Sequence, residues 1–109
     1  GTPKREIIYV DDIADACIYF MNRKTKHSLI NIGTGRDYSI KEYVKLFLKT
    51  LIPQKKIKLI FQKNKPNGTP RKLMDVTLAK NYGWKSKVEL KKAIITTYNS
   101  YKNNEKYSN

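Results

Sequence analysis

The 109-residue chain carries a formal net charge of +14 at pH 7, and 39% of its residues are hydrophobic. One domain fits this length, and the hydrophobic content excludes a generally disordered chain. The sequence contains neither an apolar run long enough to span a membrane nor a signal-peptide core, so we expect a soluble protein or, because the chain starts abruptly at Gly1, a piece of one.

The first part of the chain predicts two strands with a helix between them. Residues 5–10, REIIYV, are β-branched and aromatic and predict a strand, after which Asp11 and Asp12 can cap a helix. Four residues at helical spacing form the expected buried face of this helix: Ile13, Ala16, Cys17 and Phe20. Residues 29–33, LINIG, predict a buried strand that ends in the turn at 33–35.

The middle of the chain contains the best-marked helix. Ser39 and Glu42 have the spacing of a capping box, in which each side chain accepts a hydrogen bond from a backbone N–H at the helix start. The apolar stripe continues to Leu51, and Pro53 ends the helix. Residues 57–61, IKLIF, then predict a further strand.

The last part of the chain predicts a loop and two helices. Residues 63–70 have the composition of a loop, Thr77 can cap a short helix that Gly83 ends, and residues 90–101 show the apolar pattern of a last helix. The tail, residues 103–109, is expected to fray. Together the elements predict an α/β fold with a few short strands and about four helices.

The basic charge is spread along the chain. Of the 23 cationic residues 19 are lysines, and they run from Lys4 to Lys106 without a dense block. Such a charge attracts nucleic acid, phosphorylated ligands or anionic surfaces, but dispersed lysines mostly cover solvated faces. Because no nucleic-acid motif accompanies the charge, a nucleic-acid-binding module is kept only as an alternative.

One cysteine and one histidine limit the chemistry. Cys17 has no partner for an intramolecular disulfide, which suggests a reducing, cytoplasmic compartment, and we expect it to be a small buried hydrophobe. Cys17 and His27 lack the spacing of a metal site, and no obvious partner would orient His27 for nucleophilic catalysis. We therefore expect no metal site and an exposed loop histidine.

Two further motifs have structural explanations. Asp11 and Asp12 could form an acid/base pair, but helix capping explains adjacent aspartates before an apolar helix with fewer assumptions. The turn at 33–35, Gly-Thr-Gly, has half of a dinucleotide fingerprint without the remaining spacing. It is interpreted as an ordinary turn between a strand and a helix.

The same basic turn occurs twice, at residues 1–5, GTPKR, and at residues 68–72, GTPRK. The segments that follow the two turns differ, which argues against an internal repeat. Proline-stiffened loops that end in Arg or Lys would suit a diphosphate if they converged, because arginine can bind two phosphate oxygens at once. Two ordinary exposed turns remain the alternative.

Three segments carry a resemblance to a known family. They read GTPKREIIYVDDIADACIYFM, INIGTGRDYSIKEYVKLF and KPNGTPRKLMDVTLAKNYGWKSKVELKKAIITTYNSY, and in this order they resemble the C-terminal part of GDP-L-fucose synthases. The first two are similar to many extended short-chain dehydrogenase/reductases, whereas KPNGTPRKLMDV with the following Gly83-Trp84 is typical of the fucose synthases themselves. Asn67 departs from the family, which has Asp at this position.

The resemblance implies that residues 1–109 are a small domain that binds a GDP-sugar. It implies that NADP and the catalytic residues belong to a Rossmann domain absent from this chain, that the chain alone has no turnover, and that the intact enzyme is a homodimer. The substrate-binding residues that it implies are Arg5, Asn67 and Lys72, with Arg71 less securely assigned. Another nucleotide-sugar epimerase, dehydratase or reductase of the same superfamily is the alternative.

Overall fold

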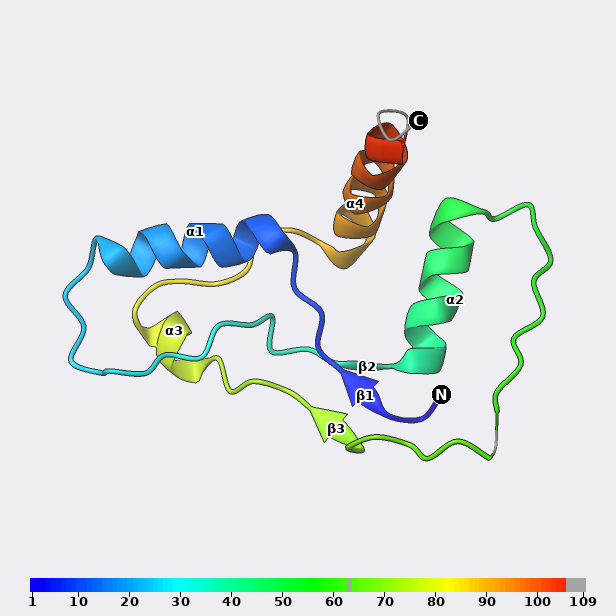
Figure 1. Cartoon of the computed structure of the whole chain (residues 1–109). Helices are drawn as coiled ribbons and strands as arrows, with labels where there is room; N and C mark the ends of the chain where they lie inside the picture. Colours follow the sequence, from blue (N-terminus) through cyan, green and yellow to red (C-terminus); the bar gives the residue numbers. More distant parts are fainter. Residues whose placement is uncertain (63, 106–109) are drawn as a thin grey trace.

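The computed structural model describes residues 1–62 and 64–105, and within this part it contains four helices and one three-stranded sheet (Figure 1). The α/β fold class is therefore confirmed. Lys63 of the predicted loop and residues 106–109 of the predicted tail lie outside the described residues. The elements in chain order are β1 (Lys4–Arg5), α1 (Val10–Met21), β2 (Tyr38–Ser39), α2 (Ile40–Leu51), β3 (Arg71–Lys72), α3 (Thr77–Asn81) and α4 (Leu90–Glu105).

The sheet has β1 at its centre, antiparallel to β2 and parallel to β3. Of the predicted strands, residues 5–10 meet this sheet only at Arg5, while 29–33 and 57–61 form no ladder, so these two predictions are wrong. β-branched residues favour an extended backbone, but a strand also requires a partner for its N–H and C=O groups. Here that pairing occurs between polar turn segments instead.

The helices lie where the sequence predicts them. The capping box of α2 is confirmed, because the N–H of Glu42 donates to Ser39 Oγ at 3.2 Å and the N–H of Ser39 donates to Glu42 Oε2 at 2.7 Å. Gly83, with φ of +87°, follows α3 and its C-cap residue in the left-handed conformation that favours glycine.

Two predicted caps are wrong. The N-cap of α1 is Tyr9, and Asp11 and Asp12 lie within the first turn. The N-cap of α3 is Val76, and Thr77 is the first helical residue, whose N–H donates to Asp75 Oδ1 at 2.9 Å. At α3 the Asp75 carboxylate accepts a helix N–H, whereas at α1 the two aspartates lie in the first turn and complement the positive end of the helix dipole. A run of adjacent polar residues does not reveal which of them is the N-cap.

The core is a small cluster between α1 and α3. Ala16, Ala79 and Trp84 form it, and partly buried residues such as Tyr19 and Ile30 pack against it. Cys17 is exposed, which corrects the prediction that it is buried, because α3 and the Trp84 segment pack on the face of α1 that carries Ala16 and Tyr19. The buried face of α1 is therefore rotated about the helix axis relative to the face that the sequence predicted.

The described chain leaves much apolar surface uncovered. Its Cα radius of gyration is 17.1 Å, whereas a compact domain of this size has about 13 Å. Large apolar side chains of α1 are open to solvent, including Met21 at 83% and Val10 at 68% exposure. This arrangement is typical of a segment that packs against further protein.

Candidate functional site

The two basic turns lie side by side. β1 and β3 are neighbours in the sheet (Figure 1). They pair in parallel, with Lys4 opposite Arg71 and Arg5 opposite Lys72. The N–H of Lys4 also donates to the carbonyl of Pro70 at 2.8 Å. Equivalent positions of the two Gly-Thr-Pro motifs are thus in register. The two turns therefore converge, while a shared ligand stays a prediction.

This pairing separates the four cations into two sets. Paired residues of neighbouring strands share a face, and successive residues alternate between faces. Lys4 and Arg71 therefore share one face of the sheet, and Arg5 and Lys72 share the other. The exposed loop that carries Asn67 leads directly into the second turn.

Arg71 is bound within the protein. Its Nε donates to Asp37 Oδ2 at 2.5 Å and its Nη2 to Asp37 Oδ1 at 3.2 Å. The Asp37 side chain is only 7% exposed. The hydrogen bond from Arg71 lowers the pKa of Asp37. The structure therefore brings Arg71 to the site but gives it an internal partner, whereas Lys72 beside it is exposed.

Arg5 connects the two turns. Its Nη1 donates to the carbonyl of Lys4 at 2.6 Å and to the carbonyl of Thr69 at 2.8 Å. A Cβ atom on Gly68 would lie 3.3 Å from Arg5 Nη2, so the guanidinium lies directly against the second turn. Gly68 follows Asn67 in the chain. Three of the predicted residues, Arg5, Asn67 and Lys72, consequently belong to one small region.

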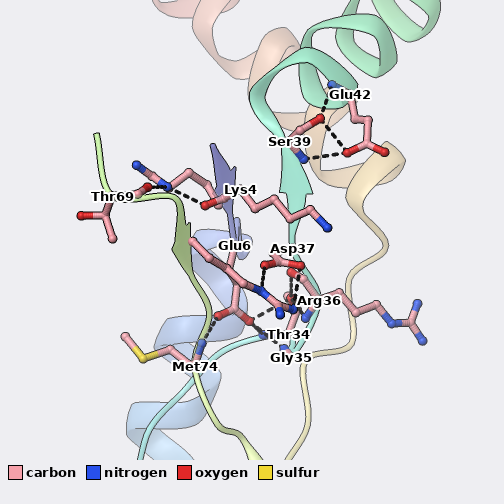
Figure 2. A network of polar contacts seen from close by, with 12 residues as sticks. Lys4, Glu6, Thr34, Gly35, Arg36, Asp37, Ser39, Glu42, Thr69 and Met74 are labelled. Carbon is pink, nitrogen blue, oxygen red and sulfur yellow. Dashed lines mark hydrogen bonds and ion pairs between the residues drawn. The ribbon is translucent and has the colours of Figure 1, made fainter. Parts of the chain in front are cut away.

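The Gly-Thr-Gly turn at 33–35 has a role that the sequence did not predict. The N–H groups of Thr34 and Gly35 both donate to Glu6 Oε1, at 2.5 and 2.6 Å (Figure 2). Gly-rich turns bind anions through such N–H groups, and here the anion is a carboxylate of the same chain. The signal that could have indicated it is the acidic residue directly after Arg5.

His27 is an exposed loop residue, as the sequence predicted, and it has a partner that the sequence did not indicate. Its Nδ1 lies 2.8 Å from the hydroxyl of Tyr82, and the hydroxyl also accepts a hydrogen bond from the N–H of Lys26. The pair joins the connection after α1 to the end of α3. The contact lies among exposed groups.

A cavity of about 1060 Å³ lies elsewhere in the described part of the chain. It lies between α2, α4 and the segment that leads from β1 into α1, and aromatic residues such as Tyr38, Tyr43 and Phe47 line it. None of Arg5, Asn67, Arg71 and Lys72 is among its lining residues. The predicted binding residues therefore lie outside this cavity.

Other kinds of site find no support in residues 1–62 and 64–105. Within these ranges no group of three or more His, Cys, Asp or Glu residues could hold a metal ion. No helix among the described residues has the length and apolar character needed to cross a bilayer.

The carboxylates predict a loss of stability in acid. Hydrogen bonds from Arg71 and from Ser39 lower the pKa values of Asp37 and Glu42 below their ordinary values of 3.8 and 4.5. A carboxylate with a lowered folded-state pKa stabilises the fold above its ordinary pKa, and this contribution is lost as the pH falls through the folded value. We expect Tm to fall as the pH drops below about 4, measured by circular dichroism. Asp37→Asn should flatten this dependence, and an unchanged Tm of the unsubstituted chain down to pH 2.5 would contradict the assignment.

Comparison with known proteins finds relatives along nearly the whole chain. The chain is 41% identical over 104 residues to the probable GDP-L-fucose synthase 1 of Oryza sativa subsp. japonica, covering 95% of this chain and 31% of that protein. It is 42% identical over 98 residues to the GDP-L-colitose synthase of Yersinia pseudotuberculosis, covering 89% of this chain and 31% of that protein. The chain thus spans about a third of these relatives' length. No family model matches it.

Solved structures of nucleotide-sugar enzymes are also similar to nearly the whole chain. A GDP-D-glycero-L-gluco-heptose synthase from Campylobacter jejuni, determined in the presence of NADPH, has a TM-score of 0.73 and 42% identity over 94% of this chain and 31% of that chain. A UDP-glucose 4-epimerase from Thermotoga maritima, with UDP-glucose, has a TM-score of 0.82 and 26% identity over 95% of this chain and 33% of that chain. Over nearly its whole length, the chain is thus similar to the C-terminal part of GDP-L-fucose synthases and related extended short-chain dehydrogenase/reductases.

Proposed function

We propose that this chain is the substrate-binding portion of an NADP-dependent enzyme that converts GDP-4-keto-6-deoxy-D-mannose to GDP-L-fucose by epimerisation and reduction. The observation that carries the proposal is the parallel pairing of the two basic turns, which places Arg5 and Lys72 opposite each other. Two cations on one face suit the two phosphates of a nucleotide sugar. The resemblance extends the proposal to a cytoplasmic homodimer.

The binding roles follow from position. Arg5 contacts the GDP-sugar with the part of its guanidinium that its Nη1 hydrogen bonds leave free, and Lys72 supplies a second charge. Asn67, next to Gly68, offers an amide for a neutral polar contact where the family has a carboxylate. Arg71 acts through its ion pair with Asp37, which fixes β3, and it contributes positive charge from the other face.

The Gly-Thr-Gly turn offers no phosphate site for NADP. The Gly-Thr-Gly turn is the feature of residues 1–62 and 64–105 that resembles a dinucleotide fingerprint, and its N–H groups bind the Glu6 carboxylate. A carboxylate at this place would repel a phosphate. We therefore place NADP and the acid/base residues in a Rossmann domain outside this chain. What this chain contributes is substrate positioning, which lowers the barrier by fixing the reactants.

Replacing Arg5 with Ala is expected to weaken binding of GDP roughly 10- to 100-fold, because a hydrogen bond to a charged group contributes about 1.5–3 kcal/mol. Isothermal titration of the 109-residue chain with GDP measures this loss. Arg36→Ala is the matched control, since it removes the same charge from an exposed position outside the site. Equal losses in the two variants would show that general charge attraction, and not this site, binds GDP.

A second titration tests the division of roles. The unsubstituted chain should bind GDP and show neither NADPH binding nor NADPH-dependent reduction of the 4-keto sugar. Reduction by the purified chain would refute the proposal that catalysis lies elsewhere.

The alternative is an enzyme that acts on another nucleotide sugar. It is favoured by the similarity to the epimerase structure that contains UDP-glucose. Titrating the chain with UDP and GDP in parallel tests it. Equal affinities would indicate that this portion recognises the diphosphate alone, while tighter UDP binding would favour the alternative.

A further inference from the structure

Glu6 joins three segments that are far apart in the chain. Its Oε1 accepts hydrogen bonds from the N–H of Thr34, the N–H of Gly35 and the hydroxyl of Thr34, the last at 3.0 Å. Its Oε2 accepts one from the N–H of Met74 at 2.9 Å. Figure 2 shows the carboxylate between the 34–35 turn and the backbone that leaves β3. One side chain therefore fixes the turn after residue 33 and the exit of β3 to the end of β1.

The chemistry of these four donors requires a carboxylate. Both ends of the side chain must accept, because every group that faces it is an N–H or O–H donor. A glutamine would place its NH₂ against a donor at one end. The space is also closely fitted, since a Cβ atom on Gly33 would lie 2.6 Å from Glu6 Oε1. These four donors and the close fit therefore form a specific binding position for the Glu6 carboxylate, and not a chance surface hydrogen bond.

The Glu6 carboxylate and its donors lie next to the candidate site. Glu6 directly follows Arg5, and Met74 lies two residues after Lys72. The pairing of Arg5 with Lys72 is therefore flanked by one hydrogen bond before it in the chain and one after it. Before it, the N–H of Lys4 donates to the carbonyl of Pro70, and after it, the N–H of Met74 donates to Glu6. In strands of only two residues such flanking hydrogen bonds decide the register, because the ladder itself has few hydrogen bonds.

We propose that Glu6 is a positioning residue of the nucleotide-sugar site. It does not touch the substrate, and it holds β1 and β3 in the register that places Arg5 opposite Lys72. The inference rests on the proposed function for its ligand, a nucleoside diphosphate, whereas the effect of Glu6 on strand pairing does not depend on any ligand.

The test combines amide hydrogen exchange with GDP titration of the Glu6→Gln variant of the 109-residue chain. Exchange of the Lys4 N–H, whose acceptor is the Pro70 carbonyl, should accelerate roughly tenfold, and the Kd for GDP should rise by a similar factor, the equivalent of one lost hydrogen bond. The N–H of Val88, which donates to Asp12 on α1, should keep its exchange rate. Thr34→Ala removes one of the four donors and keeps the carboxylate, so it provides the same comparison with a smaller effect if Glu6→Gln does not fold.

Asp12→Asn is the control for a general loss of stability, because the hydrogen bonds of Asp12 join α1 to residues 87 and 88 and not to the sheet. Equal weakening of GDP binding in Asp12→Asn and Glu6→Gln would overturn the proposal, as would unchanged Lys4 exchange in Glu6→Gln. If the unsubstituted chain binds no GDP, the proposed function of the chain fails. The Lys4 exchange rate then still decides whether Glu6 sets the pairing of the two turns.

Discussion

Replacing Trp84 with Ala is expected to abolish the cooperative unfolding of this chain. Trp84 is 2% exposed and is the largest member of the cluster that it forms with Ala16 and Ala79. Truncating a buried tryptophan costs about 3–5 kcal/mol, and a whole domain is stable by only about 5–15 kcal/mol. A chain with so small a core has little stability in reserve, so this single loss should leave no folded population at 37 °C.

The measurement is thermal unfolding followed by circular dichroism. Trp84→Phe should retain a transition at a lower Tm, because it keeps most of the apolar volume and loses the indole N–H that donates to Asp15 Oδ2 at 2.8 Å. Met21→Ala on α1 is the control, because that side chain is exposed and its loss should change Tm little. A Trp84→Ala variant with an unchanged transition would mean that the cluster does not hold the chain together.

Replacing Asp12 with Asn is expected to destabilise the fold by about 1–3 kcal/mol, because it leaves a partly buried backbone N–H without an acceptor. Asp12 is 3% exposed, and its two oxygens accept the N–H groups of Lys87 and Val88, each at 3.1 Å. An asparagine keeps the shape but offers an acceptor at one end only. Urea denaturation measures the loss as a lower midpoint with an unchanged slope.

Asp11→Asn is the matched control for Asp12. It makes the same change of charge in the same first turn of α1, at an exposed position. Both variants weaken the interaction with the helix dipole, so a larger loss in Asp12→Asn reports the hydrogen bonds that Asp12 accepts. Equal destabilisation would show that the dipole accounts for the effect of Asp12.

The hydrogen bonds from residues 84–88 to Asp12 and Asp15 of α1, here called the clamp, also affect how binding experiments are interpreted. Asp12 and Asp15 hold the segment that leads to α4, while the basic turns lie at the sheet. Variants in the clamp should therefore lose GDP binding only to the extent that they unfold. Titration at a temperature well below the Tm of each variant separates this loss from the loss in Arg5→Ala.

Local sequence determined the helices of this protein. The capping box at Ser39 and Glu42 and the stop at Gly83 are found as predicted, because hydrogen bonds between near neighbours and the conformational freedom of glycine act within one turn of chain. The motifs were sufficient to indicate the family that the comparisons support. They also drew attention to the two basic turns.

Only the tertiary structure decided the pairing, the buried face and the partners of the charges. The apolar segments 29–33 and 57–61 have strand composition and form no ladder, while Lys-Arg and Arg-Lys dipeptides do. Cys17 is exposed because α3 packs on a different face of α1 from the one that spacing alone suggested. Strand pairing and ion pairs such as Arg71 with Asp37 join residues that are distant in sequence, and their free energy depends on which backbone and which charge lie opposite. No single segment contains that information. Only the tertiary structure shows that the two basic turns lie together as one candidate site, with Glu6 beside it.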